Sequence, residues 1–168
     1  MAHITTLRAE RGVSLIEVMV AVLVFSVGLL GIAMLQMRGA QFTKDSSSRT
    51  AAIVLARSLA ESMRANASVA IPADGSASAY LYDGSKTYSK DDCATTNLTT
   101  PADVAKRDLA CWQLALAANL PPPPTGGKVA TVTKDASLGT LVIRVSWTGV
   151  ADNADASASQ SYSFTYLQ

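Results

Sequence analysis

The stretch that decides the fold is residues 11–38, which read RGVSLIEVMVAVLVFSVGLLGIAMLQMR. Residues 18–37 are twenty consecutive positions without a charged side chain. A helix of about 20 residues covers the ~30 Å hydrocarbon core of a bilayer. A secretory signal peptide has a shorter apolar stretch, of about 7 to 15 residues, followed by a small-residue cleavage site. Because this run instead leads into Gln36, Arg38 and Gln41, it predicts a membrane span that remains in the mature chain.

One carboxylate, Glu17, stands at the start of the apolar run. An unpaired acidic side chain in a membrane helix costs about 3 kcal/mol, so such residues usually have a partner and a function. If the chain were cut after Gly12, the new amino group on Val13 would be a cation about one helical turn from Glu17. The dipole of its own helix already favours this carboxylate, and the free amine of a neighbouring chain would compensate it more fully. The alternative is an ordinary single-pass anchor in which Glu17 reaches the cytoplasmic interface.

The residues before the run predict its orientation and the location of the rest of the chain. Arg8 and Arg11 outnumber Glu10, and the positive-inside bias then favours a cytoplasmic N-terminus. The bulk of the chain would lie across the membrane, where disulfides persist. The two cysteines, Cys93 and Cys111, therefore predict a disulfide that would stabilise a small domain by about 3 kcal/mol. Two unrelated buried thiols are the alternative.

Composition and charge exclude several classes of function. Lys plus Arg number 14 and Asp plus Glu 13, so the net charge of +1 implies no nucleic-acid partner. The single histidine, His3, lies in the segment expected to be removed, which excludes histidine-based catalysis. Two cysteines alone cannot complete a tetrahedral zinc site. Two aspartate pairs, Asp91 with Asp92 and Asp152 with Asp155, are interpreted as solvated turns rather than calcium ligands. We expect no enzymatic activity, no cofactor and no metal.

Residues 38–70 continue the helix with an amphipathic pattern. Apolar residues recur there at spacings of three and four, which predicts one buried face consisting of Ala52, Leu55, Ala56, Leu59 and Met63. The serine-rich residues 43–50 are a predicted weak point, since serine side chains compete for backbone hydrogen bonds. Because Pro72 follows, the helix should end near residues 66–70.

Residues 71–127 predict a loop region with one short helix at about residues 101–119. Thr100 is a good N-cap for this helix, and four prolines at residues 121–124 prevent its continuation. Its buried stripe should consist of Leu109, Trp112, Leu116 and Leu120. Three tyrosines in the preceding loop, Tyr80, Tyr82 and Tyr88, could form an exposed binding surface, although loop tyrosines usually pack over their own domain.

Residues 128–168 contain three strand-like segments, at 128–134, 140–147 and 161–167. We expect an antiparallel meander in which successive side chains of the middle strand alternate between the two faces. One of the two faces should cover the long helix. One face should hold Leu141, Ile143, Val145 and Trp147. The opposite face should hold Val142, Arg144 and Ser146.

The N-terminal segment resembles that of type IV prepilins, in which a short basic leader ends in glycine and an apolar helix follows with glutamate at its fifth position. The resemblance implies a leader of residues 1–12 and an assembly helix of residues 13–37. It further implies that a prepilin peptidase of the inner membrane cleaves after Gly12 and methylates the new N-terminus at Val13, where phenylalanine is the commonest residue of the family. Glu17 would then pair with the N-terminus of a neighbouring subunit during assembly.

The carboxy-terminal half is similar to the minor-pilin subgroup often called PilV. Residues 108–127, DLACWQLALAANLPPPPTGG, and the VSW at residues 145–147 carry this resemblance. It implies an α+β, type IV pilin-like fold: a long N-terminal helix, half transmembrane and half amphipathic, packed on a small antiparallel sheet of three to four strands. An extra short helix would lie in the connecting region.

The implied function is that of a minor pilin that helps to initiate or cap a pilus, and so serves motility or adhesion. The implied partners are other minor and major pilins, the prepilin peptidase, the inner-membrane assembly machinery and inner-membrane lipid. The chain would cross the bacterial inner membrane once, with a periplasmic domain, and reach the pilus surface after assembly. The alternatives are a pseudopilin of a type II secretion system and a binding module that resembles a tip adhesin.

Overall fold

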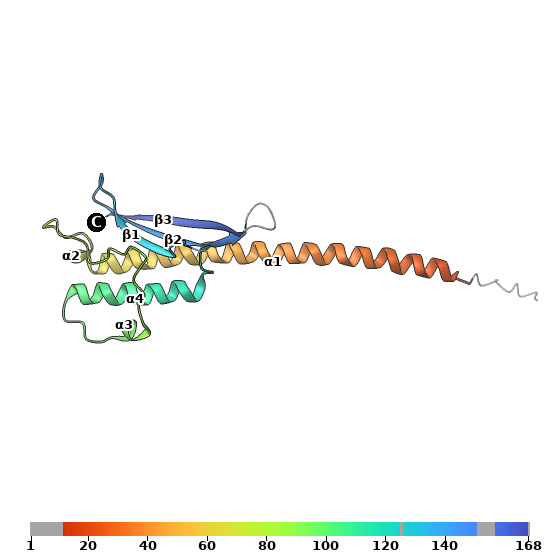
Figure 1. The fold of residues 1–168 in the computed structure, drawn as a ribbon, viewed down its shortest axis with the longest axis horizontal. Helices are drawn as coiled ribbons and strands as arrows, with labels where there is room; N and C mark the ends of the chain where they lie inside the picture. The colour runs from red at the N-terminus through yellow and green to blue at the C-terminus, as the bar shows by residue number, and fades with distance from the viewer. Residues whose placement is uncertain (1–11, 125, 151–156, 168) are drawn as a thin grey trace, which may run out of the picture. The chain divides into compact units, whose positions relative to one another are not determined.

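The computed structural model describes residues 12–124, 126–150 and 157–167, and the chain forms two units, residues 1–41 and 42–168. In chain order the elements are α1 (Leu15–Ala65), α2 (Ala67–Ala70), α3 (Lys90–Ala94), α4 (Pro101–Asn119), β1 (Ala130–Lys134), β2 (Leu141–Val150) and β3 (Ser157–Tyr166), labelled in Figure 1. Helix α1 belongs to both units. The remaining elements lie in the second unit.

Helix α1 is unbroken over 51 residues, including the serine-rich residues 43–50. The expected weak point therefore does not interrupt the helix. The hydroxyl of Thr50 donates to the carbonyl oxygen of Ser46 at 3.0 Å, and Ser48 is buried. Both of these side chains are thus accommodated within an intact helix, although serine and threonine are only modest helix formers. The helix ends at Ala65, and α2 follows after one residue.

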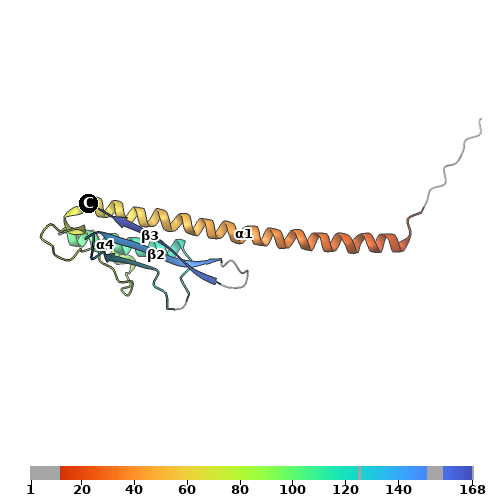
Figure 2. The same cartoon turned by 90° about the horizontal axis from the view of Figure 1, so that it is seen from above.

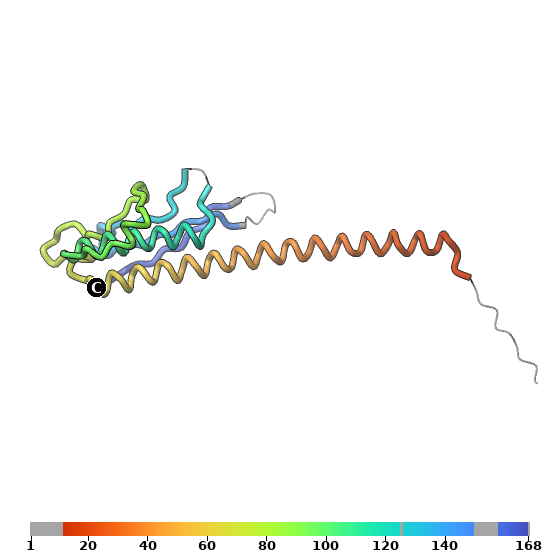
Figure 3. The backbone as a smooth tube through the Cα atoms, turned by 90° about the horizontal axis from the view of Figure 1, so that it is seen from below, coloured from red at the N-terminus to blue at the C-terminus, as the bar shows by residue number. Residues whose placement is uncertain are grey.

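The second half of α1 buries the face that its periodicity predicts. Ala52, Ala56, Leu59 and Met63 are at most 2% exposed, and Leu55 is half-buried. Helix α4 lies beside this half of α1 and runs in the opposite direction, as Figures 1 and 3 show. The buried residues of α1 belong to one hydrophobic core with residues of α4 and of the sheet.

Helix α4 is closed at its N-terminus by a reciprocal pair of hydrogen bonds. The Thr100 hydroxyl accepts from the Asp103 amide at 3.2 Å, and the Asp103 carboxylate accepts from the Thr100 amide at 2.9 Å. This capping box satisfies two backbone donors that a helix start otherwise leaves unpaired. The helix begins at Pro101 and ends at Asn119, and its predicted stripe is buried: Leu109, Trp112, Leu116 and Leu120.

The three strands form one antiparallel sheet in the order β1-β2-β3, shown from above in Figure 2. Strand β2 alternates as expected, with Leu141, Ile143, Val145 and Trp147 buried in the core. Both β2 and β3 are longer than their sequence patterns indicate, because their pairing continues from Trp147 with Gln160 to Val150 with Ser157. Most residues at these positions are small or polar, which hides the strand signal. The long helix, the small antiparallel sheet and the extra short helices are those of a type IV pilin fold, as predicted.

The connecting region contains one helix that the sequence pattern did not predict. Helix α3 begins after Ser89, whose hydroxyl accepts from the Asp92 amide at 3.2 Å while the Asp92 carboxylate accepts from the Ser89 amide at 2.9 Å. The spacing of Ser89 and Asp92 is that of a capping box, so the signal was present in the sequence. With only five residues, α3 is too short to show periodicity.

Candidate functional site

The first turn of α1 places the predicted assembly carboxylate directly after the predicted cleavage junction. Gly12 and Val13 precede the helix and are exposed. The helix starts with hydrogen bonds from the amides of Glu17 and Val18 to the Ser14 carbonyl oxygen, at 3.0 and 3.3 Å. Glu17 therefore lies in the first turn of the helix, at the positive end of the helix dipole. In the part of the chain that the structure describes, no side chain pairs with this carboxylate.

The first half of α1, which carries Glu17, is apolar on all sides. Every large apolar side chain from Val13 to Met37 is at least 50% exposed, and none of the most apolar 18-residue window is buried. The mean hydropathy of that window is 2.7, so by length and composition α1 can cross a membrane. A helix without a polar face needs lipid or other helices around its whole circumference. Glu17 is the one acidic residue in this exposed apolar surface.

The two cysteines join α3 to α4. Cys93 and Cys111 form a disulfide with a Cα–Cα distance of 4.7 Å. Next to it, the ammonium group of Lys106 lies 3.5 Å from the Asp92 carboxylate. Hydrogen bonds from Ser89, and to a lesser extent the positive charge of Lys106, hold the pKa of Asp92 below its usual value. The disulfide thus fixes a five-residue helix that has little stability of its own.

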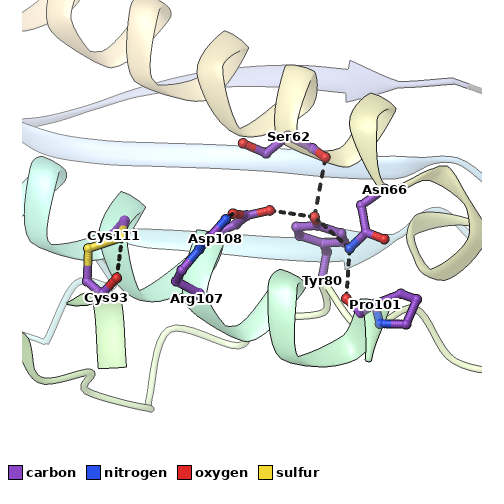
Figure 4. Close-up of polar contacts among 8 residues, drawn as sticks. All are labelled: Ser62, Asn66, Tyr80, Cys93, Pro101, Arg107, Asp108 and Cys111. Carbon is purple, nitrogen blue, oxygen red and sulfur yellow. Dashed lines mark hydrogen bonds and ion pairs between the residues drawn. A yellow bond between two sulfur atoms is a disulfide. The ribbon is translucent and has the colours of Figure 1, made fainter. Parts of the chain in front are cut away.

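A partly buried polar junction, drawn in Figure 4, connects the end of α1 to α4. The hydroxyl of Tyr80 donates to the Asp108 carboxylate at 2.8 Å and lies 3.3 Å from the Ser62 carbonyl oxygen. The Asn66 side-chain amide donates to the Tyr80 hydroxyl at 3.2 Å and to the Pro101 carbonyl oxygen at 2.8 Å. Burial raises the pKa of Tyr80 far above its usual value, so the hydroxyl keeps its proton. The junction is structural, and the sequence pattern did not predict it because its residues are far apart in the chain.

The other two loop tyrosines are also part of the core. Tyr82 and Tyr88 are each 7% exposed, and both bond to Gln113 on α4. The Gln113 amide donates to the Tyr82 hydroxyl at 2.7 Å, and its carbonyl oxygen accepts from the Tyr88 amide at 2.7 Å. Of the two outcomes considered for these tyrosines, packing over their own domain is correct, and they form no exposed binding surface.

The aspartate pairs show no metal-binding geometry where they can be described. Asp92 caps α3 and Asp91 is exposed beside it, whereas Asp152 and Asp155 lie outside the described residues, as does His3. Within the described ranges, no three His, Cys, Asp or Glu side chains come together in a way that could hold a metal ion.

Two family models match the chain. The model described as the prokaryotic N-terminal methylation motif matches residues 7–33, and the model described as type IV pilin Tt1218 matches residues 34–110. The first match covers Gly12, Val13 and Glu17. The second covers the rest of α1, the connecting region and the first half of α4. No curated protein and no solved structure matches the chain.

Type IV pilins are structural rather than enzymatic proteins, and their methylation motif implies contact with a prepilin peptidase and with other pilins. The apolar first half of α1 accords with a membrane anchor. The methylation-motif match at residues 7–33 and the type IV pilin match at residues 34–110 together support a pilin-type protein.

Proposed function

We propose that this protein is a minor pilin of the PilV type, which takes part in initiating or capping a type IV pilus. A prepilin peptidase would remove residues 1–12 by cutting after Gly12 and would methylate Val13. The chain would cross the inner membrane once, with its domain in the periplasm, until it enters the pilus. Residues 13–37 would serve as the transmembrane and assembly segment, residues 38–70 as the amphipathic helix, residues 71–127 as the connecting region and residues 128–168 as the sheet.

The observation that carries the proposal is the position of Glu17. It lies in the first turn of an exposed apolar helix, four residues after Val13, and no described residue pairs with it. A carboxylate in hydrocarbon is unfavourable until a cation neutralises it. A neighbouring subunit that is cleaved after Gly12 would supply such a cation at its own N-terminus. Pairing would then make docking of the apolar helices favourable only in a register that brings the amine to the carboxylate.

The proposal is tested with Glu17→Ala in the full chain in its host. We expect normal cleavage, since the peptidase acts at Gly12, but loss of the protein from sheared pili. Mass spectrometry of the membrane-bound protein would report an N-methylated Val13 in both wild type and variant. Immunoblots of the sheared fraction would report incorporation.

Glu61→Ala is the matched control, because Glu61 is an exposed glutamate of the same helix whose ion pair within the described ranges is with Arg64, one turn away. It should enter the pilus at wild-type levels. Wild-type incorporation of Glu17→Ala would overturn the role of Glu17. A mature chain that still begins at residue 1 or 2 in cells with active peptidase would overturn the cleavage, and the ordinary-anchor interpretation would then apply.

A further inference from the structure

A loop of the connecting region covers the outer edge of β1. The amide of Tyr82 donates to the Val132 carbonyl oxygen at 3.0 Å, and the Val132 amide donates to the Tyr82 carbonyl oxygen at 2.7 Å. Beside this pair, Gly84 approaches so closely that a Cβ atom there would lie 2.7 Å from the Ala130 carbonyl oxygen. The Tyr82 hydroxyl also accepts from Gln113 of α4. The loop is therefore fixed to both β1 and α4.

A pocket of about 720 Å³ lies where this loop, β1 and the first half of α4 meet. Its volume falls in the range of about 300 to 1,000 Å³ that is usual for small-ligand sites. Four buried side chains, each at most 7% exposed, line it: Tyr82, Tyr88, Leu109 and Val132. Because these side chains belong to the close-packed core of the domain, they give the pocket firm walls.

Three lysines line the same pocket, one from each wall: Lys86 from the loop, Lys106 from α4 and Lys134 from β1. The chain contains six lysines in all: Lys44, Lys86, Lys90, Lys106, Lys128 and Lys134. Half of them therefore line this one site, which we call the lysine pocket. Of the described residues in its lining, Asp83 alone is acidic. The lining thus carries three positive charges against one negative, whereas the whole chain is nearly neutral at +1.

Neighbouring side chains hold two of these ammonium groups in place. The ammonium group of Lys86 lies 4.7 Å from the centroid of the Tyr88 ring, in a cation–π contact, and that of Lys106 lies 3.5 Å from the Asp92 carboxylate. An ammonium group has three donors, so each contact leaves donors for a ligand. Lys134 has no ion pair among the described residues. Groups that are already positioned lose less freedom on binding, which favours affinity.

Hydroxyl groups and a carboxylate add further hydrogen-bonding capacity to the lining. The hydroxyls of Tyr88 and Thr133 have no hydrogen-bond partner in the described part of the chain. Burial and the nearby charge of Asp92 raise the pKa of Tyr88, so its hydroxyl remains a donor. The Asp83 carboxylate accepts from the amide and the hydroxyl of Ser85 and retains further acceptor positions. The lysine pocket therefore offers donors to an anion and acceptors to hydroxyl groups.

This combination argues against an inorganic anion and against an acidic peptide as the ligand. The lysines would attract phosphate, but Asp83 would repel it. An extended peptide binds through backbone hydrogen bonds at a free strand edge, and Tyr82 already occupies the β1 edge here. A ligand with both a carboxylate and hydroxyl groups can use the lysines, the hydroxyls and Asp83 together. A uronic acid has this chemistry, and lysine, as a compact point charge, suits its single carboxylate.

We propose that the lysine pocket binds uronic acids, either as free sugars or as units of an acidic polysaccharide. The three ammonium groups would attract the carboxylate, while Tyr88 and Asp83 would bond to hydroxyl groups of the sugar. Every residue of the pocket lies in the unit of residues 42–168. The inference therefore goes beyond the proposed pilin function and depends neither on cleavage of the leader nor on Glu17.

The test is isothermal titration calorimetry of the full chain in detergent micelles, at neutral pH and low salt. Galacturonate should bind at least about tenfold more tightly than galactose, its neutral counterpart, and than inorganic phosphate. Trigalacturonate should bind at least about tenfold more tightly than triglutamate, which carries the same net charge. If the trimer binds more than about tenfold more tightly than the monomer, the ligand is a polysaccharide unit; a smaller difference assigns the pocket to a free sugar.

Substitutions test the individual residues. Lys134→Gln should weaken galacturonate binding at least about tenfold, because a charged hydrogen bond to the carboxylate is lost. Lys90→Gln is the matched control and should change nothing, since Lys90 is an exposed lysine outside the lining. Tyr88→Phe removes only the hydroxyl and should weaken binding about fivefold. Circular dichroism checks that each variant is folded, and Lys86→Gln replaces Lys134→Gln if the latter is not.

Three results would overturn the inference: no heat of binding with trigalacturonate at about 10 mM, equal binding of triglutamate, or equal losses in Lys134→Gln and Lys90→Gln. Unchanged affinity in Tyr88→Phe would likewise contradict a ligand that bears hydroxyl groups. The measurement requires neither processing nor assembly. A chain that binds uronic acids but does not enter pili would therefore support the lysine pocket while contradicting the proposed function.

Discussion

The indole nitrogen of Trp112 donates to the carbonyl oxygen of Leu55 at 3.0 Å, which links α4 directly to the backbone of α1. Leu55 lies in the half of α1 that packs against the domain, and Trp112 is 5% exposed. The second tryptophan, Trp147, is 1% exposed, but among the described residues its indole nitrogen has no partner. Comparing the same substitution at the two tryptophans therefore separates the effect of a hydrogen bond from the effect of burying an indole ring.

Replacing Trp112 with phenylalanine should destabilise the domain more than the same change at Trp147. Both substitutions remove similar apolar volume, but only Trp112→Phe also removes a buried hydrogen bond, worth about 1 kcal/mol. Urea unfolding of the full chain in detergent micelles, followed by circular dichroism, measures both. Equal losses would show that the bond to Leu55 adds nothing to stability.

Loss of the disulfide should lower the free energy of unfolding by about 2 to 4 kcal/mol. The two cysteines are 18 residues apart, and the bond constrains the unfolded chain as well as fixing α3 on α4. The double variant Cys93→Ser with Cys111→Ser, compared with the oxidised and the reduced wild type, tests this. The reduced wild type should behave like the double variant. If it keeps the stability of the oxidised form, the bond is not what stabilises this region.

A methyl group at Gly84 should disrupt the cover of the β1 edge. Gly84 has a φ of 80°, and its Cβ would lie 2.7 Å from a backbone oxygen, so Gly84→Ala combines backbone strain with a clash. We expect a loss of about 1 to 3 kcal/mol. Gly75 is the matched control, because its φ is 77° but no atom lies within 4 Å of its Cβ position. A similar loss at both glycines would mean that strain alone accounts for the effect.

The capping box of α4 should make part of the stability depend on pH. Hydrogen bonds from Thr100 and Thr99 hold the pKa of Asp103 below its usual value. Because the folded chain then binds this proton less readily than the unfolded chain, the contribution is present above the unfolded pKa and is lost as pH falls through the folded one. Between about pH 5 and about pH 2.5, wild type should lose more stability than Asp103→Asn. Parallel curves would exclude a contribution from this carboxylate.

Much of the fold could be predicted from the sequence because the responsible signals are local. The uncharged run of twenty residues predicts the membrane-length helix, and Thr100 three residues before Asp103 predicts the start of α4. The alternation along residues 141–147 predicts strand β2. The signals that failed were short or polar. Helix α3 has only five residues, and the ends of β2 and β3 read as loop because most of their residues are small or polar. The serine-rich segment of α1 stayed helical although serine and threonine are only modest helix formers.

The sequence by itself determined the proposed site in residues 12–17, because the proposed cleavage junction, the N-terminus that cleavage would create and the carboxylate lie within two helical turns of one another. Only the tertiary structure decided that the three tyrosines are buried, that a polar junction forms around Tyr80, and that the two sheet edges differ. Those features depend on which distant segments meet: Tyr80 reaches Asp108, and Tyr82 closes one edge of a sheet whose other edge ends at β3. Contacts between residues far apart in the chain leave no periodic pattern along it, so they emerge only when the chain folds.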